Sequence, residues 1–551
     1  MMASPALFTA SRSQTLTYLL AVCPFSIAFL VFINSSISFV VTNLIGLQDG
    51  EGDAVGTLGF ADELLALVAC PLWGVLSDRI GVRHVCTAGY AILALALVVF
   101  VQATNIYPQL LLGRLLFSIG GSAVSTMVTA VLPTVTGNAK AQAYRVSVSS
   151  ELTITPERVR NGQATPTAGA SPSARLSGFV GTCAGCGALV ALTIFLPLAA
   201  RFEGMGLSPA QAIQRSYYVV AAVALAISLV CFIGLRDLPG EKGKSWSVLW
   251  TSDTDEEDED DDSFIERPKM SYWKQLMTAL TLGFRNRSIG LGYVGGFVAR
   301  ASSVGISLFI PLAVNHYYRA SGLCHEDREP VSGSGLGDIK KACPRAYIVA
   351  SILTGSSQLI ALIAAPVFGY LTDKSRRYNF PLLSAALVGI IGYVVFAMLP
   401  APHFQKPDGS PWVFVVMALL GISQIGAIVC SLAVLSNGIL RVSIDDETLR
   451  KLYEERCANG DENEPDEGQS LLGGSVNRRL EHLSHLKGSI AGVYSLYGGA
   501  GILLLTKVGG LLFDELSTST PFFIMAGFNG ILLVTGLICG GMNHLGSGRS
   551  R

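Results

Sequence analysis

The charged side chains within long apolar stretches of the sequence include Asp62, Glu63, Arg114 and Arg300. A charge at membrane depth is costly, so such a residue usually faces a partner or a water-filled cavity and serves a function. Asp62 and Glu63 lie about six residues into one apolar stretch and Arg114 about six into another, which predicts a shared depth. A carboxylate beside an arginine can change its proton occupancy, so these three residues are candidates for proton coupling; a purely structural ion pair is the alternative.

Asp62 and Glu63 are adjacent in the sequence, and adjacent residues on a helix point about 100° apart. They therefore cannot both face one cavity. Arg300, about twelve residues into its stretch, has no acidic residue on its own predicted helix. It either faces a central cavity, where it would bind an anionic group of a solute, or pairs with a carboxylate from another helix.

Uncharged polar side chains at the predicted midplane complete the set of substrate-cavity candidates. Each could contact a solute or simply hydrogen-bond a neighbouring helix, an interaction worth about 0.6 to 2 kcal/mol. Besides Arg300, the set consists of Asn34, Gln358, Gln424, Tyr494 and Tyr497.

A nine-residue segment recurs 295 residues later in the chain. The first copy runs from Pro71 to Arg79 and the second from Pro366 to Lys374. Each copy stands at the end of the second apolar stretch of its half of the chain. Such a repeat is what a duplicated unit of six helices would produce.

The apolar stretches that carry these residues are long enough to cross a membrane. Hydrophobic residues make up 50% of the 551 positions and charged residues only 14%, whereas about 25% of an ordinary soluble domain is charged. A membrane-spanning helix needs about 20 apolar residues. Twelve windows meet this requirement, at 18–41, 57–76, 85–103, 108–132, 178–198, 215–235, 288–313, 346–371, 380–400, 411–436, 488–512 and 520–542.

Lysine and arginine residues are distributed unevenly between the two sides of these windows. Most of the 39 lie on one side, which predicts that this side, and with it both termini, is cytoplasmic. The predicted domains are a cytoplasmic N-terminus at 1–17, a six-helix bundle at 18–235, an acidic cytoplasmic linker at 236–287, a second six-helix bundle at 288–542 and a cytoplasmic tail at 543–551. The linker and the inside loop 437–487 are rich in charge and are predicted to be disordered.

Sequence patterns of catalysis and of metal or cofactor binding are absent. There is no HExxH, no GxSxG and no paired Cys or His spacing suited to zinc. We therefore predict no enzyme, no metal and no cofactor. The near balance of 39 basic and 40 acidic residues argues against nucleic acid as a partner. The expected partners are a small-molecule substrate, membrane lipid and, if the Arg114 region couples transport, protons; no oligomer is required.

Two segments outside the windows carry further predictions. Cys324 and Cys343 share the longest outside loop, where a disulfide would close about 20 residues and contribute about 3 kcal/mol; two free thiols are the alternative. Within the inside loop, the residues Glu467, Leu471 and Leu472 resemble an acidic dileucine sorting signal. Such a signal predicts a vacuolar or lysosomal membrane, with the plasma membrane as the alternative.

The repeated segment resembles the loop signature of the major facilitator superfamily, in which a Gly, an Asp-Arg pair, a second Gly and a basic residue lie between spans two and three. The residues that carry the resemblance are Gly74, Asp78, Arg79, Gly81 and Arg83 in the first copy and Gly369, Asp373, Lys374, Arg376 and Arg377 in the second. The resemblance implies an all-α polytopic membrane protein with twelve transmembrane helices in two pseudo-symmetric six-helix bundles. A substrate cavity would lie between the bundles at the midplane.

In that family, this loop is a conformational latch. A glycine lets two helices cross closely, and a carboxylate can accept charge-assisted hydrogen bonds from an arginine or a helix N-terminus in one transport state and lose them in another. The resemblance therefore assigns the repeated residues, except Gly81 and Arg377, to a latch. For Asp78 and Asp373, a solvated loop charge is the alternative.

The stretch from Gly113 to Gly121 resembles the fourth-span signature of the same family, in which an Arg is linked to proton coupling. It departs from that signature at Phe117 and Ser118, where Gln and Gly are usual. We therefore expect secondary active transport of a small solute by alternating access, with proton coupling through Arg114 as a further expectation. The alternative is a solute sensor that has the fold of a transporter and does not transport.

Overall fold

The computed structural model describes residues 10–46, 51–136, 172–239, 241, 244, 271–321, 344–375, 379–404, 409–458 and 486–548. Within these ranges the regular secondary structure is entirely helical. Twelve helical segments are long and apolar enough to cross a membrane. The prediction of an all-α protein with twelve spans is therefore confirmed.

The twelve spans follow the predicted windows closely. They are Arg12–Ile37, Val55–Ile80, Val82–Phe100, Ile106–Thr136, Ser173–Gly204, Pro209–Gly234, Arg287–Tyr318, Ile348–Lys374, Phe380–Ala397, Trp412–Leu440, Lys487–Phe513 and Thr520–Gly540. Several extend beyond the apolar core of their window because polar residues at a helix end continue the same backbone hydrogen-bond ladder.

The first half of the chain forms one group of helices and short π-helical turns. Its elements are α1 (Arg12–Thr17), η1 (Tyr18–Val22), α2 (Cys23–Phe39), η2 (Val40–Ile45), α3 (Glu51–Ile80), α4 (Val82–Phe100), η3 (Ile106–Leu110), α5 (Leu111–Thr136), α7 (Pro172–Val190), η5 (Ala191–Phe195), α8 (Leu198–Gly204) and α9 (Pro209–Gly234).

The second half forms another group. Its elements are α10 (Tyr272–Arg285), α11 (Arg287–Val304), η7 (Gly305–Phe309), α12 (Ile310–Ala320), α14 (Pro344–Lys374), α15 (Phe380–Ala397), α16 (Trp412–Ala458), α18 (Lys487–Leu504), η8 (Leu505–Gly509), α19 (Gly510–Glu515) and α20 (Thr520–Gly548).

Local sequence signals explain several helix starts. Ser11 begins α1 with a capping box, in which its hydroxyl accepts from the Gln14 amide and the Gln14 side chain accepts from the Ser11 amide. Ser208 caps α9, whose first residue is proline. The Asn286 side chain accepts from the amides of Ser288 and Ile289 and so caps α11.

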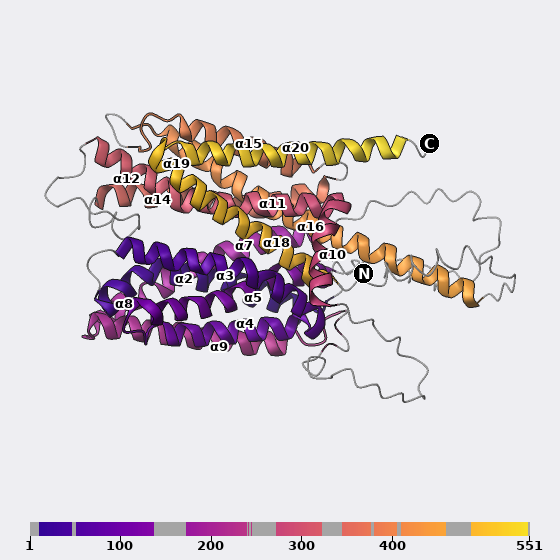
Figure 1. Cartoon of the computed structure of the whole chain (residues 1–551), viewed down its shortest axis with the longest axis horizontal. Helices are drawn as coiled ribbons and strands as arrows, with labels where there is room; N and C mark the ends of the chain where they lie inside the picture. The colour runs from indigo at the N-terminus through magenta and orange to yellow at the C-terminus, as the bar shows by residue number, and fades with distance from the viewer. Residues whose placement is uncertain are drawn as a thin grey trace, which may run out of the picture.

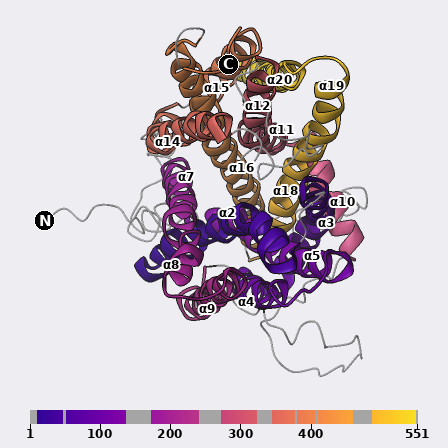
Figure 2. The same ribbon diagram turned by 90° about the vertical axis from the view of Figure 1, so that its left-hand side faces the viewer.

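The two halves pack as two bundles that lie side by side. Figure 2, an end-on view, shows the indigo and magenta helices of the first half below and the orange and yellow helices of the second half above. In Figure 1 the ribbons of the two bundles lie closest at the right, where α18 slants from the second bundle toward α3. We call this the latch end, because the Asp78 and Asp373 loops lie there.

The surfaces of the bundles carry many exposed apolar side chains. Leu20, Leu229, Ile363, Leu387 and Val534 are examples, each between 49% and 65% exposed. In water such surfaces would be unfavourable, whereas lipid chains solvate them well. Together with the twelve spans, they fit an integral, multi-pass membrane protein.

Two stretches differ from the predicted disorder. Within the linker 236–287 the residues 272–285 form the helix α10, whose apolar side chains Leu276, Ala279 and Leu282 pack against the second bundle. Within the inside loop 437–487 the helix α16 continues to Ala458. Both predictions were wrong at these positions because charge content hid an amphipathic period in the first case and a helix continuing from a span in the second.

Candidate functional site

A seam of glycines joins the two bundles at the latch end. Gly74 of α3 lies against Gly488 and Gly492 of α18, and a Cβ added at Gly74 would be only 2.8 Å from the Gly492 Cα. Real side-chain carbons essentially never come so close, so the helices can cross here only while both positions lack side chains. The role predicted for Gly74 in a close helix crossing matches this geometry.

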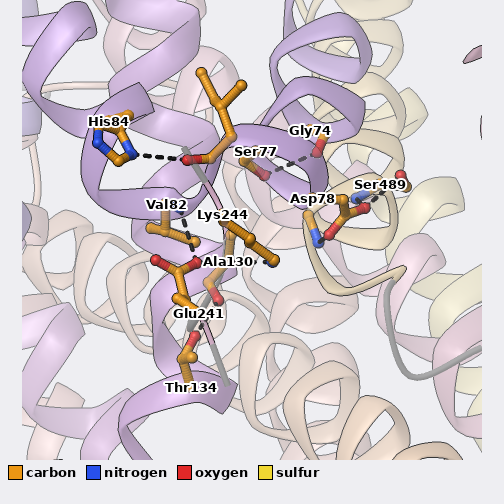
Figure 3. Close-up of polar contacts among 12 residues, drawn as sticks. Gly74, Ser77, Asp78, Val82, His84, Ala130, Thr134, Glu241, Lys244 and Ser489 are labelled. Atoms are coloured by element: carbon orange, nitrogen blue, oxygen red, sulfur yellow. Dashed lines mark hydrogen bonds and ion pairs between the residues drawn. The ribbon is translucent and has the colours of Figure 1, made fainter. Parts of the chain in front are cut away.

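Asp78 lies one helical turn beyond Gly74 and is buried, with 8% of its surface exposed. Its Oδ1 accepts a hydrogen bond from the Gly488 amide at 2.6 Å. Its Oδ2 accepts from the Ser489 amide at 2.7 Å and from the Ser489 hydroxyl at 2.6 Å. The carboxylate of the first bundle therefore caps the N-terminus of α18 in the second bundle, where amide groups and the helix dipole favour negative charge. Figure 3 shows Asp78 pointing at Ser489.

The second copy of the repeat makes an equivalent crossing with α7. Gly369 of α14 lies against Gly178, and a Cβ added at Gly178 would be 2.9 Å from the Gly369 Cα. Asp373 accepts a hydrogen bond from the Arg175 Nε at 2.6 Å, and the two form an ion pair between the bundles. Nearby, the Ser173 hydroxyl and the Asn437 Oδ1 are 2.5 Å apart, which adds another contact between the bundles.

The other predicted latch residues have different surroundings. The Arg79 guanidinium stacks on the Tyr272 ring of α10, 3.5 Å from its centroid. The Arg83 Nε donates to the Phe232 carbonyl oxygen at 2.7 Å, which ties α4 to α9 within the first bundle. Lys374 ends α14 and is exposed. Arg376 lies outside the described residues.

The linker contributes contacts around Asp78 and Val82 that the sequence did not predict. The Gln275 Nε2 of α10 donates to the Asp78 Oδ2 at 3.2 Å. The Glu241 Oε1 accepts from the Val82 amide at 2.8 Å, and the Lys244 Nζ is 3.9 Å from the same oxygen. Figure 3 shows Glu241 and Lys244 beside Val82, in the region of the loop that holds Asp78. The spacing of Leu276, Ala279 and Leu282 could have predicted α10; no sequence signal points to Glu241.

A second cluster lies deeper in the first bundle, around Arg114 of α5. Arg114 is buried, with 3% of its side chain exposed, and forms an ion pair with Asp62 of α3. The same Nη2 atom donates to the Asn34 Oδ1 of α2 at 2.6 Å. The Nε and Nη1 atoms of Arg114 are buried without a partner in the described part of the chain. Three spans thus converge on one guanidinium that keeps unused donors.

Glu63 takes no part in the hydrogen bonds of this cluster. It lies on the face of α3 that continues through Leu67, Cys70 and Gly74, and this face meets α18. Within the described ranges, Glu63 makes no hydrogen bond and no ion pair in direct contact, although it interacts electrostatically with Arg300 and Arg114. The two neighbouring carboxylates therefore serve different surroundings, as the helical geometry predicts.

Arg300 of α11 lies at the boundary between the bundles. Its Cγ would be 2.7 Å from a Cβ added at Gly498 of α18, so its aliphatic stem packs on that glycine. The side chain is half-buried. Among the residues that the structure describes, it has no partner in hydrogen-bond or ion-pair contact, although it interacts electrostatically with Glu63.

The uncharged cavity candidates fall into two groups in the second bundle. The Gln358 Nε2 donates to the Gln424 Oε1 at 3.1 Å, and the Gln424 Nε2 donates to the Ser303 hydroxyl at 3.0 Å. The Tyr494 hydroxyl is 3.1 Å from the Ser431 hydroxyl. The Tyr497 ring stacks on Tyr293, with centroids 5.2 Å apart. Asn34 belongs to neither group, because it bonds Arg114 in the first bundle.

The remaining predicted residues lie outside the described part of the chain. They are the disulfide candidates Cys324 and Cys343 and the sorting candidates Glu467, Leu471 and Leu472. Among the described residues, no group of three or more His, Cys, Asp or Glu side chains could hold a metal ion.

Comparison with known proteins places this geometry in context. The sequence matches the family model of the Major Facilitator Superfamily over residues 24–150 and 168–441. No curated protein matches the sequence.

Three solved structures illustrate the similarity of fold. FucP, a Major Facilitator Superfamily transporter in the outward conformation, is 12% identical with a TM-score of 0.52, and the match covers 96% of this chain and 99% of FucP. The proton:xylose symporter XylE bound to 6-bromo-6-deoxy-D-glucose is 11% identical with a TM-score of 0.52, covering 95% and 94%. The human organic anion transporter MFSD10 (TETRAN) is 12% identical with a TM-score of 0.50, covering 95% and 99%. At these identities the likeness concerns the fold.

Proposed function

Since the chain belongs to the major facilitator superfamily, we propose that it is a secondary active transporter that carries a small solute across a membrane by alternating access. The observation that carries this proposal is the pair of latches. Each joins one copy of a repeated loop to the first turn of a helix in the other bundle. Contacts of this kind can break and reform as one bundle rocks against the other.

In the proposed cycle, the described structure is the state closed at the latch end. The hydrogen bonds of Asp78 with Gly488 and Ser489, and the ion pair of Asp373 with Arg175, all join the bundles there. The FucP structure, which the chain resembles, is named as outward. We assign the latch end to the cytoplasm, as the distribution of Lys and Arg predicts, so that this state also opens outward.

Proton coupling would act through Asp62 and Arg114. While Asp62 is charged, it holds the Arg114 guanidinium, together with Asn34. Protonation of Asp62 would remove the ion pair and free Arg114 to use its two unpartnered donors elsewhere, which links proton binding to a rearrangement of α3 and α5. The names of the neighbours FucP and XylE as proton symporters agree with this proposal.

The solute would bind between the bundles, near the midplane. Arg300 and Tyr497, both half-buried, present charge, a hydroxyl group and aromatic surface from the second bundle, whereas Tyr494 is buried and bonded to Ser431. Asn34 presents an amide from the first bundle, and the hydrogen-bonded side chains of Gln358 and Gln424 add further hydrogen-bonding groups. Such a mixture of apolar wall and few polar groups is typical of small-molecule sites.

The experiment that tests the proposal uses the full-length protein in proteoliposomes containing a pH dye. A panel of sugars, organic acids, amino acids and cationic drugs is added outside, and proton movement is measured together with tracer uptake. We expect one class of solute to be taken up together with protons. The variant Asp62→Asn preserves the side-chain shape and should lose solute-driven proton movement. Asp237→Asn is the matched control, because that carboxylate is exposed at the end of the first bundle.

Two outcomes would contradict parts of the proposal. Uptake without proton movement in the unaltered protein would exclude proton coupling and leave a uniporter or a carrier coupled to another ion. A solute that binds the purified protein and yet never crosses the membrane would favour the solute sensor over the transporter.

A further inference from the structure

One face of α3 forms a continuous row along the boundary between the bundles. Glu63, Leu67, Cys70 and Gly74 are spaced by four, three and four residues, so their side chains share this face. The row packs on α18. Gly492 lies against the Cys70 carbonyl oxygen and the Gly74 Cα, and a Cβ added at Gly499 would be 3.3 Å from the Leu67 Cδ1. Glu63 continues the row by one turn, about 16 Å from Gly74 along the helix.

Arg300 reaches the same level from the opposite bundle. The adjacent glycines Gly498 and Gly499 of α18 contact Arg300 and Leu67, respectively. The stem of Arg300 and the turn of α3 that follows Glu63 therefore lie on either side of one pair of glycines. Arg300 interacts electrostatically with Glu63, which belongs to this row.

The charges of this region do not all neutralise one another by contact. Asp62 and Arg114 already form an ion pair within the first bundle. That leaves the carboxyl group of Glu63 on one bundle and the guanidinium group of Arg300 on the other. Both side chains are half-buried, and neither has a hydrogen-bond or ion-pair partner among the described residues. Opposite charges near the middle of a membrane protein are costly while they stay apart, and a ligand that bridges them would offset that cost.

We propose, building on the proposed transport function, that Glu63 and Arg300 together bind the two charged ends of a zwitterionic solute of the amino acid class. The guanidinium of Arg300 binds the carboxylate of the solute, and the carboxylate of Glu63 binds its ammonium group. Because the two residues belong to different bundles, such a solute contacts both halves of the transporter at once.

The arrangement of charge favours a zwitterion over a solute with a single charge. A monoanion would satisfy Arg300 and leave Glu63 without compensation, and Glu63 would repel it. A monocation would satisfy Glu63 and be repelled by Arg300. Only a solute with both charges, at a separation that spans the two side chains, leaves neither residue unpaired.

A binding experiment on the purified full-length protein in nanodiscs tests this inference without measuring transport. Each amino acid is compared with its decarboxylated amine and its deaminated acid, for example leucine with 3-methylbutan-1-amine and 4-methylpentanoate. The readout is the ligand-dependent shift of thermal stability, from which affinity is obtained. We expect at least one amino acid to bind and each single-charge analogue to bind about 10- to 100-fold more weakly, since each loses one charge-assisted contact.

Variants identify the residues. Arg300→Gln should weaken binding of the amino acid about 10- to 100-fold while leaving the affinity for the amine analogue nearly unchanged. Glu63→Gln should weaken binding of the amino acid by a similar factor. It should leave the affinity for the acid analogue unchanged or raise it. Asp237→Asn, which alters an exposed residue three positions beyond the end of α9, should change neither the affinity for the amino acid nor the affinity for its analogues. Unaltered melting temperatures of the ligand-free variants establish that they are folded.

Three results would overturn the inference: no amino acid binds, the acid analogue binds as tightly as the amino acid, or both variants retain full affinity for the amino acid. In the last case, Glu63 and Arg300 do not bind the solute and only compensate each other's charge. An amino acid that binds as expected and is not carried across proteoliposomes would contradict the proposed transport function alone. Proton-coupled uptake of an uncharged sugar would contradict the zwitterion inference alone.

Discussion

The two copies of the repeated loop use the same glycine and the same carboxylate to make different contacts. In the first latch, Asp78 is buried and binds two backbone amides and a hydroxyl at the start of α18. In the second latch, Asp373 binds the side chain of Arg175, which is 43% exposed. The glycine crossings beside them are similar, with added Cβ atoms at Gly74 and Gly369 2.8 and 2.7 Å from the facing Cα.

This difference separates what the repeat determines from what it does not. Glycines set how closely the helices cross, and both copies preserve that spacing. The chemistry of the carboxylate depends on what the partner helix offers, either free amides or a flexible arginine. The first latch is also supported by the linker, through Gln275, Glu241 and Lys244. We therefore expect the first latch to contribute more free energy to the closed state than the second.

The largest effect should come from Asp78→Asn. An amide in place of the buried carboxylate loses the charge-assisted component of four hydrogen bonds, three from Gly488 and Ser489 and one from Gln275, and the interaction with the dipole of α18. We expect the closed latch to lose about 3 kcal/mol, which corresponds to roughly a hundredfold change in its equilibrium. The measurement is the distance between spin labels at Ile233 and Phe380, exposed residues at the latch ends of opposite bundles, by double electron–electron resonance. The labels are attached through non-native amino acids, because the chain contains eleven cysteines.

The comparison with Asp373→Asn decides whether the two latches are unequal. If Asp78→Asn shifted the distance distribution no more than Asp373→Asn, the buried cap on α18 would have no special weight. A third variant, Ser489→Ala, should produce a smaller shift in the same direction, because it removes one hydroxyl donor and leaves both amides.

The glycine crossings should respond in the same direction in both latches. Gly74→Ala and Gly178→Ala each place a methyl group against the backbone of the facing helix, where no flexible side chain can move aside. Overpacking of this kind typically costs 1 to 3 kcal/mol. We expect about 2 kcal/mol for each variant, measured with the same pair of labels.

Gly530→Ala is the matched control for these variants, because an added Cβ at that position of α20 meets nothing within 4 Å. It should leave the distance distribution unchanged. A strong effect of Gly74→Ala without an effect of Gly178→Ala would show that the two crossings are not equivalent and that the second latch is not closed by close packing.

The sequence predicts where the two repeated loops lie in the chain, but it does not predict which residues they contact. The twelve spans and the repeated loop follow from apolar length and from self-similarity, which are properties of short segments. The contact of Asp78 with Gly488 and Ser489 depends on how the two bundles come together in space. Asp78 and Gly488 are 410 residues apart in the sequence, so no local pattern predicts that they meet. The sequence predicts only that the partner of each aspartate is an arginine or a helix N-terminus. Asp78 binds a helix N-terminus and Asp373 binds an arginine.

The charges inside the membrane show the same limit. A shared depth and the 100° rule predicted that Arg114 could meet one of the two adjacent carboxylates, and the structure selects Asp62. Which of the two carboxylates faces α5 depends on the rotation of α3, which the packing of Gly74 on α18 determines. Glu241 was hidden for another reason, because the segment around it carries no apolar pattern that would indicate a tertiary contact. Gln275, in contrast, lies on α10, whose apolar period is visible in the sequence.

A smaller effect is expected from Asp373→Asn. Its partner Arg175 is 43% exposed, and ion pairs near a surface are weakened by water and salt. We expect the closed state to lose about 1 kcal/mol. Arg175→Gln should shift the label distance by the same amount, and the shift should shrink as salt concentration rises. Salt-independent behaviour of both variants would contradict the view that the second latch depends on an exposed ion pair.

The smallest effect tests whether the linker supports the first latch and not the second. Glu241 accepts from the Val82 amide at the start of α4, next to Gly81, which has a φ of +93° and no side chain to cap the helix itself. Loss of this cap in Glu241→Gln should cost about 0.5 to 1 kcal/mol. Because Glu241 and Asp78 stabilise the same loop, the two substitutions should not add, whereas Glu241→Gln and Asp373→Asn should add. Asp237→Asn, three residues beyond α9 and 82% exposed, serves as the control. Equal additivity with both latches would mean that Glu241 stabilises the first bundle as a whole and has no particular connection with Asp78.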